Sequence, residues 1–482
     1  MRNSLTTSAR QCSVLIAALL VLGVPLTAWL FWPRQPSYAL GAVALPALLV
    51  WVMRRPLHGV FLSIVVVGLL PQAPQEIGFR ELAFLAIWGT TLFAWLCNGL
   101  LSRRVPLPIS PITVALLTFL GILVLSLPIA LARGTTLYEW TRGLAPFVPL
   151  LVFFVVAAEA HDARTYRQLL WAFVLVSSWL AGQTVFTYWH ERLWEPVFIP
   201  GVGLIYRRVT WIFDAATSPL ILAGAIIALV EALFAQGWLK RLAFWGVAFF
   251  LSGAIVLTLS RSEIAVLIFT AISTIFIVLL KGRLRLARFT WQALFVGLLI
   301  TIIAATAPIS PLQEQIQSRV QSLVRVVWSL LAPQSPADVE DINILARLNE
   351  FTMALNAFSE QPLVGQGLGY SYEVPPAMSG EDTARVQYVH NIIAYFLMTT
   401  GLLGTGILVI LTVIALLVFW HKYQRETSTD WDRVLVAAGS ALAALWLYAL
   451  FFAVFRTLSF NFVVGVALAL LASHHPARVL RA

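Results

Sequence analysis

The stretch VQYVHNIIAYFLMTTGLLG, from Val386 to Gly404, places two polar residues directly before a long apolar run. That run, at 391–420, is long enough to cross a membrane, which takes about 20 consecutive apolar residues. His390 and Asn391 therefore stand at the mouth of a predicted span. Either they only mark its polar end, or they carry chemistry at the membrane surface.

The composition extends this pattern to the whole chain. Of the 482 residues, 60% are hydrophobic and 11% are charged, whereas soluble domains carry about 25% charged residues. The mean hydropathy is +0.86. We therefore expect an all-α, polytopic membrane protein with about 12–14 transmembrane helices. Apolar windows lie at 13–32, 38–53, 59–70, 82–101, 112–132, 145–158, 169–188, 217–235, 242–259, 264–280, 291–307, 391–420, 434–454 and 459–473.

Three of these windows, 59–70, 145–158 and 459–473, are short enough to be re-entrant or broken helices. The first window resembles a signal peptide in outline, but it is long enough to span, and we interpret it as a retained helix. Cys12 and Cys97 provide neither a disulfide framework nor a metal-ligand spacing.

The distribution of charge predicts the orientation. With the N-terminus in the cytoplasm and alternating spans, the inner segments hold 19 of the 32 Lys and Arg residues but only six of the 22 Asp and Glu residues. This agrees with the positive-inside rule. The net charge of +10 is thus explained by topology, and it does not indicate a nucleic-acid partner. All predicted external cations are arginines, whose planar donors bind phosphates bidentately.

The predicted organisation has four parts. Transmembrane helices occupy 1–188; further helices, the Arg207/Arg208 loop and the Arg261 turn occupy 189–307; a long external loop occupies 308–389; C-terminal helices occupy 390–482. The loop is too long for a passive connection.

Within the external loop, an apolar stripe including Ile316, Val320 and Val324 predicts a helix lying on the membrane or on the protein. A second helix is expected over INILARLNEFTMALNAFSEQ, 342–361, and PLVGQGLGY after it favours tight backbone turns. The segment from Gln334 to Asp341 is expected to be mobile. The GxGxG spacing precedes no helix, so it does not indicate a dinucleotide site.

Only two of the seven histidines, His190 and His390, fall outside. If Asn391 caps the following helix, the helix dipole favours a neutral imidazole and a bound phosphate there. A neutral imidazole is the form that a general base needs.

Four arginines are further candidates for the functional site, besides His390 and Asn391. Arg261 in TLSRSEIAVL lies close to the hydrocarbon, where a cation needs a partner or ligand, and Glu263 could be that partner. Arg347 lies on an otherwise apolar helical stretch, where it either covers that face or binds a ligand. Arg207 and Arg208 form a doublet whose default interpretation is a solvated loop.

Together, TLSRSE, ARLNEFTMALNAFSEQPLVGQGLGY and VHNIIAYFLMTTGLLG resemble, in that order, elements of the O-antigen ligase and O-antigen polymerase family of bacterial envelope glycosyltransferases. The resemblance covers roughly 209–406. It implies an enzyme of the bacterial cytoplasmic membrane, with both termini inside and its active site on the outer face.

The resemblance also implies the reaction. A glycan would pass from undecaprenyl diphosphate to an acceptor hydroxyl, with inversion and without a metal or other cofactor. His390 would take the hydroxyl proton, and Arg261 and Arg347 would stabilise the leaving diphosphate. Arg207, Arg208 and Asn391 would add donor contacts, and the acceptor would be a glycan or lipid-linked molecule.

Three alternatives stay open from the sequence. A polymerase of the same family would extend another lipid-linked repeat, and no residue decides between it and a ligase. A transporter would show repeated halves and mid-membrane charges, which we do not find in the sequence. A scaffold of an export complex is supported only by membrane residence. For the enzyme, we predict that Arg261, Arg347 and His390 converge in one cavity under the external loop.

Overall fold

The structure, a computed structural model, describes residues 48–69, 79–101, 109–190, 194–199, 203–208, 217–257, 260–282, 342–374 and 384–473. Four sequence predictions lie outside these residues: the spans at 13–32 and 291–307, the surface helix containing Ile316, and the segment from Gln334 to Asp341. Most of the predicted span at 38–53 also lies outside them.

The described residues are overwhelmingly helical. The helices are α3 (Pro56–Leu69), α4 (Phe79–Leu101), α5 (Pro111–Ala132), α6 (Leu137–Leu144), α7 (Val152–Glu159), α8 (Ala163–His190), α9 (Ser218–Phe234), α10 (Trp238–Leu257), α11 (Arg261–Leu280), α14 (Ile342–Glu360), α16 (Ile392–Arg425), α17 (Thr429–Ala449) and α18 (Leu458–Ala472), with 3-10 turns η1 (Ala145–Leu151) and η3 (Ala453–Arg456). Two antiparallel hairpins, β1 (Trp194–Ile199) with β2 (Gly203–Arg208) and β3 (Tyr372–Val374) with β4 (Ala384–Val386), complete them.

The predicted fold class is confirmed: the chain is an all-α, multi-pass membrane protein. Among the described residues, seven helical stretches are long and apolar enough to cross a membrane, and four shorter apolar helices accompany them. The predicted helix at 342–361 is also confirmed, as α14.

One predicted boundary was wrong. The window at 145–158 is the second part of a helical stretch that runs without interruption from Leu137 to Glu159. Thr136 and Glu139 form a capping box that starts α6, and Pro146 and Pro149 tighten the chain into η1 instead of ending it. The charged side chains of α6 hid this start from a hydropathy window.

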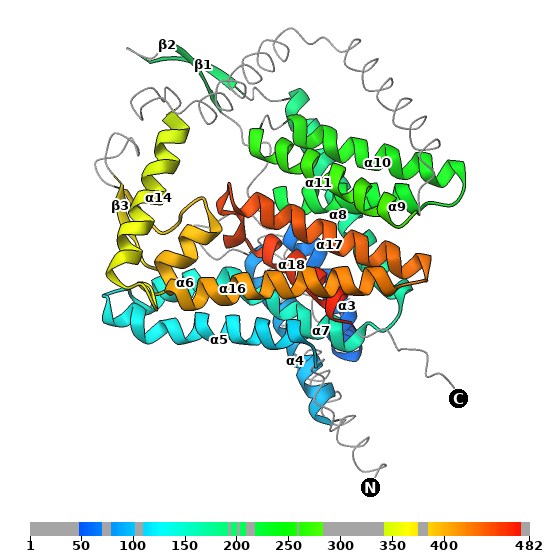
Figure 1. The fold of residues 1–482 in the computed structure, drawn as a ribbon, viewed down its shortest axis with the longest axis horizontal. Coiled ribbons are helices and arrows are strands. Elements are labelled where there is room, and N and C mark those ends of the chain that lie inside the picture. Colours follow the sequence, from blue (N-terminus) through cyan, green and yellow to red (C-terminus); the bar gives the residue numbers. More distant parts are fainter. Residues whose placement is uncertain are drawn as a thin grey trace, which may run out of the picture.

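Burial explains the order of the layers. Every residue of α9 is buried, and α18 is buried over nearly its whole length, which is typical of helices surrounded by others. Helices α8, α10 and α17 pack on α9, while α16 packs on α5 and α17. In Figure 1, α14 lies across one end of this bundle, beside the start of α16. We call this the His390 end.

Helix α16 is broken near its start, at Gly401. The break frees backbone groups on both sides, and an unpaired backbone group inside a membrane protein is costly. The segment after α14 satisfies them. The N–H groups of Gln366 and Gly367 donate to the carbonyls of Met398 and Thr399, and the N–H of Leu402 donates to Pro362. The glycine-rich loop and the apolar helix therefore form one unit.

Glycine is required where these two segments meet. Gly401 has φ 62° and ψ −158°, and a Cβ there would lie 2.5 Å from the backbone of Leu363. Gly365 has φ 68°, and its Cβ would lie 2.5 Å from the carbonyl carbon of Thr399. The tight turns predicted for PLVGQGLGY are confirmed, because Gly365, Gly367 and Gly369 all have positive φ.

Charged side chains fasten the opposite end of the bundle. Arg167 of α8 and Arg433 of α17 approach the buried Glu231 of α9 at 3.4 and 3.5 Å. Lys281 at the end of α11 pairs with the buried Asp432 of α17. These ion pairs are far along the helices from His390, and they join helices rather than line a cavity.

Candidate active site

The centre of the candidate site is a contact between His390 and Glu350. Nδ1 of His390 lies 2.8 Å from Oε2 and 3.0 Å from Oε1 of Glu350, and the backbone N–H of His390 donates to Oε2 at 3.1 Å. The two residues come from the start of α16 and the middle of α14. When Glu350 is ionised, its carboxylate only accepts hydrogen bonds, so Nδ1 of a neutral His390 carries the proton and Nε2 keeps its lone pair.

Glu350 lies in a partly dry environment. Its side chain is 18% exposed, as is that of His390. Burial raises the pKa of the Glu350 carboxyl to about 7, while the nearby Arg347 opposes this shift. The carboxyl therefore changes its charge in the neutral range, where it controls which nitrogen of His390 is free.

Arg347 is the second charged group at this carboxylate. Its Nη1 lies 3.4 Å from Oε2 of Glu350, and its guanidinium stands 5.5 Å from the ring of Phe452. The side chain is 39% exposed, and its other N–H groups have no partner within the part of the chain that the structure describes. Arg347 can therefore bind an anion without leaving Glu350.

Asn391 acts as the cap of α16, which meets the condition that the sequence argument about His390 required. Its Oδ1 accepts from the N–H of Ala394, and its Nδ2 donates to the carbonyl of Leu450, both at 3.0 Å. The cap joins α16 to the end of α17 and fixes the direction in which His390 leaves the helix. A role of Asn391 in phosphate binding stays a prediction.

Aromatic rings surround the imidazole. The ring of Tyr388 lies 5.0 Å from that of His390, and the ring of Phe452 lies 5.8 Å away, both edge-on. The hydroxyl of the buried Tyr372 donates to the carbonyl of Tyr388 at 2.8 Å. These contacts restrict the rotation of His390 and exclude water from one side of it.

The structure places Arg261 as the first residue of α11, without describing its side chain. Two residues later, the buried Glu263 accepts from Ser218 at 3.1 Å and from Tyr448 at 2.5 Å. The Tyr448 ring in turn lies 5.4 Å from Phe452. The start of α11 therefore belongs to the His390 end. Glu263, which the sequence offered as a local partner for Arg261, binds groups of α9 and α17.

Arg207 and Arg208 lie on β2, opposite Glu195 and Trp194 of β1. The sequence predicted a loop here, and the structure forms a hairpin instead. The position of their side chains is outside the description, so their proposed donor contacts stay predictions. The convergence of Arg261 with Arg347 and His390 also stays a prediction; Arg347 and His390, whose side chains the structure describes, both lie at the Glu350 carboxylate.

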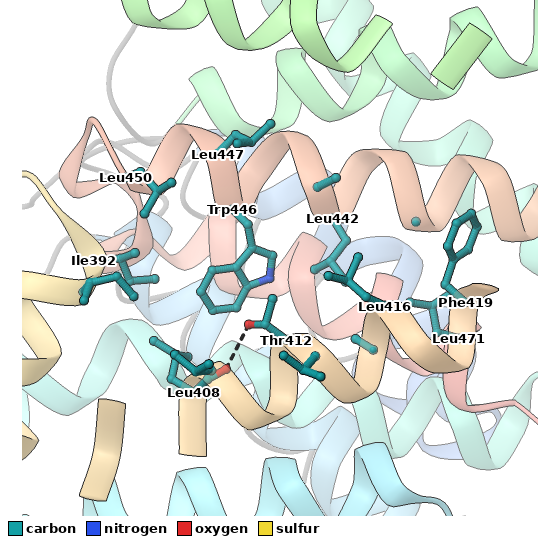
Figure 2. A pocket seen from close by; sticks show the side chains of 16 residues that line it. Ile392, Leu408, Thr412, Leu416, Phe419, Leu442, Trp446, Leu447, Leu450 and Leu471 are labelled. Atoms are coloured by element: carbon teal, nitrogen blue, oxygen red, sulfur yellow. Dashed lines mark hydrogen bonds between the residues drawn. The ribbon is translucent and has the colours of Figure 1, made fainter. Parts of the chain in front are cut away.

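An apolar groove begins beside the capped start of α16 (Figure 2). It has a volume of about 380 Å³ and runs between α16 and α17, with Ile392 and Leu450 at one end and Phe419 at the other. Residues 408–419 and 439–450, twelve in each stretch, form its two walls and correspond to a length of about 17 Å. Ile392, Ile393 and, from α18, Leu471 complete the lining. Its polar hydroxyl, on Thr412, donates back to Leu408, so the surface offered to a ligand is apolar.

The groove is open on one side. Among its lining residues, Val409, Val413 and Leu416 are 46%, 47% and 52% exposed, as expected for a surface that faces lipid tails. For metals, no three His, Cys, Asp or Glu side chains of the described residues are grouped so that they could hold an ion.

Fold and site together define a class: a multi-pass membrane protein with an imidazole, a carboxylate and an arginine at one end of a broken span. Residues 246–409, roughly a third of the chain, match the family model described as O-antigen ligase. This confirms the resemblance and supports a membrane enzyme of the O-antigen ligase and polymerase type. The matched segment contains Arg261, Arg347, Glu350 and His390. A search among curated proteins gives no match to the chain.

Glu350 is the residue that the sequence interpretation missed. It follows Arg347 by three positions in ARLNEF, so both side chains lie on one side of α14. That spacing was available in the sequence, and it indicated a local ion pair. The contact with His390, 40 residues later, depends on how α14 crosses the start of α16.

Proposed function

We propose that this protein transfers a glycan from undecaprenyl diphosphate to an acceptor hydroxyl at the outer face of the bacterial cytoplasmic membrane. The observation that carries the proposal is the pairing of His390 Nδ1 with Glu350, on a carboxylate that Arg347 also approaches. This arrangement supplies a general base, a group that orients it, and a cation for the leaving group. The match to the O-antigen ligase family supports the same chemistry.

In the proposed reaction, Nε2 of His390 accepts the proton of the acceptor hydroxyl. The hydroxyl oxygen forms a bond to the anomeric carbon while the bond from that carbon to the diphosphate breaks. The electron pair of the broken bond leaves with the diphosphate. Because the hydroxyl attacks directly, from the face opposite the diphosphate, the configuration at the anomeric carbon inverts. Glu350 stabilises the imidazolium that results, and Arg347 stabilises the charge that grows on the diphosphate.

The activated donor explains why this chemistry works without a metal or nucleotide. A diphosphate is a good leaving group, and a fixed cation at its oxygen atoms lowers the barrier further. We propose Arg261 and one of Arg207 and Arg208 as additional cations for it, and Asn391 as the residue that holds the helix start beside it.

The groove between α16 and α17 is the proposed site of the polyprenyl tail. Its first residues, Ile392 and Leu450, are joined to the catalytic end by the Asn391 cap. A tail lying in this groove would place its diphosphate next to His390 and Arg347. The groove is apolar and open towards the membrane, so a lipid can enter it sideways.

The test is transfer by the full chain in nanodiscs that contain an undecaprenyl diphosphate-linked glycan. His390→Ala should lose transfer by roughly 10²–10⁴-fold, which is the usual contribution of a general base, and should still bind the donor. His190→Ala, the other histidine predicted to be external, should transfer like the parent. Equal transfer by His390→Ala and the parent would refute the assignment of the base.

The same assay separates a ligase from a polymerase. One arm offers a lipid A core-type acceptor, and the other offers a second lipid-linked repeat. We expect product with the final carrier. Product only with the second repeat would identify a polymerase, and movement of the donor across the bilayer without a new glycosidic bond would identify a transporter.

A further inference from the structure

A third arginine lies at the His390 end and is absent from the mechanism above. Arg456 is the last residue of η3, between α17 and α18. Its Nη1 donates to the carbonyl of Gln387 at 3.0 Å, three residues before His390. Its guanidinium stands 5.8 Å from the rings of both Tyr388 and Tyr395. The cation is thus packed among aromatic rings in a half-buried position.

Arg456 has no acidic partner among the residues that the structure describes. Its Nε is buried and has no hydrogen-bond acceptor there. At the opposite end of the bundle, Nε of Arg433 is likewise buried without an acceptor, but Arg433 has a carboxylate nearby, because it approaches Glu231 at 3.5 Å. Arg347 likewise has Glu350. A guanidinium that is partly removed from water without a counter-charge is costly, and in membrane proteins it commonly marks a ligand site.

Tyrosine residues connect Arg456 to the candidate active site. The Tyr388 ring touches the guanidinium on one side and lies 5.0 Å from the His390 ring on the other. Both arginines also influence the pKa of the buried Tyr372. Burial raises the pKa of Tyr372, Glu350 adds to the rise, and both Arg347 and Arg456 counteract it. Arg347 and Arg456 therefore approach the same small region from α14 and from η3.

We propose that Arg456 is a second residue that binds the diphosphate of the polyprenyl donor, opposite Arg347. This inference rests on the proposed function. Two cations on different elements can hold two phosphate groups at once, each with charge-assisted hydrogen bonds. Glu350 neutralises Arg347, but none of the described carboxylates pairs with Arg456. Arg347 and Arg456 together therefore keep a net positive charge that can bind an anion. Arg456 also lies beyond the segment that matches the O-antigen ligase family, which ends at residue 409.

A purely structural role for Arg456 would be to hold the backbone at Gln387, and hence the position of His390. The two roles predict different effects on the binding of ligands with and without phosphate. A phosphate contact matters only for a ligand that carries phosphate. A backbone contact shapes the site for every ligand alike, and its loss lowers the stability of the empty protein.

The experiment measures binding of two probes to the full chain in nanodiscs: undecaprenyl diphosphate and the uncharged undecaprenol. Arg456→Gln should weaken binding of the diphosphate about tenfold or more, the usual effect of losing a charge-assisted bond. It should leave undecaprenol binding unchanged. Arg456→Lys should fall between the parent and Arg456→Gln, because it keeps the charge and loses the fork. Arg142→Gln, on an exposed arginine of α6, is the matched control and should bind both probes normally.

Three results would overturn the inference. Arg456→Gln could bind undecaprenyl diphosphate like the parent, or it could lose both probes equally together with a lower melting temperature, which would make Arg456 a structural residue. If Arg456→Gln does not fold, Arg456→Lys provides the test. Diphosphate binding by Arg456→Lys that equals the parent's, with the same dependence on salt, would show that the paired donors of the guanidinium do not bind the diphosphate. A parent that binds the diphosphate but transfers no glycan would refute the proposed function alone.

Discussion

Nδ1 of His390 lies 2.8 Å from a carboxylate oxygen of Glu350, although 40 residues separate them in the chain. Glu350 also accepts the backbone N–H of His390, so this carboxylate fixes both the ring and the peptide that carries it. An imidazole held at Nδ1 presents Nε2 in one direction. This relationship is the basis of the first two predictions.

Glu350→Gln should retain the fold and the donor affinity and lose transfer by roughly 10²–10⁴-fold, the usual contribution of acid–base assistance. The amide keeps the size of the carboxylate but cannot stabilise an imidazolium. Glycan transfer and donor binding in nanodiscs measure the two effects separately. Glu360→Gln, an exposed residue near the end of the same helix, is the control. Parent-like transfer by Glu350→Gln would remove Glu350 from the mechanism.

Transfer should rise with pH through the neutral range. Burial raises the pKa of Glu350 to about 7; below it the protonated carboxyl donates to Nδ1, and Nε2 then carries the hydrogen and cannot act as a base. Arg347, His390 and Tyr372 also face this carboxyl. The pH profile of transfer should therefore change when Glu350 becomes Gln. An identical inflection in both proteins would contradict this origin.

The same group predicts how stability depends on pH. A carboxyl whose folded pKa exceeds its unfolded value of 4.5 binds more protons in the folded state between pH 4.5 and about 7. The stability of the folded state should thus fall as pH rises through this window, and it should fall less in Glu350→Gln. Melting temperatures of both proteins across the window provide the measurement. A steeper fall in the variant would show that the sign is wrong.

Gly401→Ala should destabilise the protein by about 1–3 kcal/mol or more, the usual cost of a strained backbone conformation. The residue has φ 62°, and its new Cβ would meet Leu363 at 2.5 Å. Gly406→Ala is the matched control, because a Cβ at that position of α16 meets nothing within 4 Å. Melting in detergent compares the two. Equal melting temperatures would show that the break tolerates a side chain.

Filling the groove should reduce affinity for the lipid donor. Ala443→Trp adds a large side chain to the α17 wall of the groove and should weaken binding of undecaprenyl diphosphate severalfold. Leu417→Trp is its control, since Leu417 is 63% exposed and lies outside the groove lining. The measurement is the binding of undecaprenyl diphosphate to both variants. Parent-like binding by Ala443→Trp would show that the polyprenyl tail lies outside the groove.

The sequence alone determined the class of the fold, the positions of most of the spans that the structure describes, and the α14 helix, and it offered Asn391 as a possible helix cap. These features depend on hydropathy and on contacts between residues a few positions apart, both of which can be read locally. It also singled out Arg347 and His390 by residue type and by resemblance to a family. For Arg261, Arg207 and Arg208 it gave roles that remain predictions.

Only the tertiary structure decided which distant residues contact one another at the site. The break at Gly401 was invisible to hydropathy, because an apolar sequence stays apolar whether or not the helix is continuous. Glu350 pairs locally with Arg347, three positions before it, but it meets His390 only because α14 lies across the start of α16. Arg456, at the far end of the chain, reaches the site because α17 returns to the His390 end. Such contacts join residues distant in sequence, so they follow from the packing of the helices and not from any local pattern.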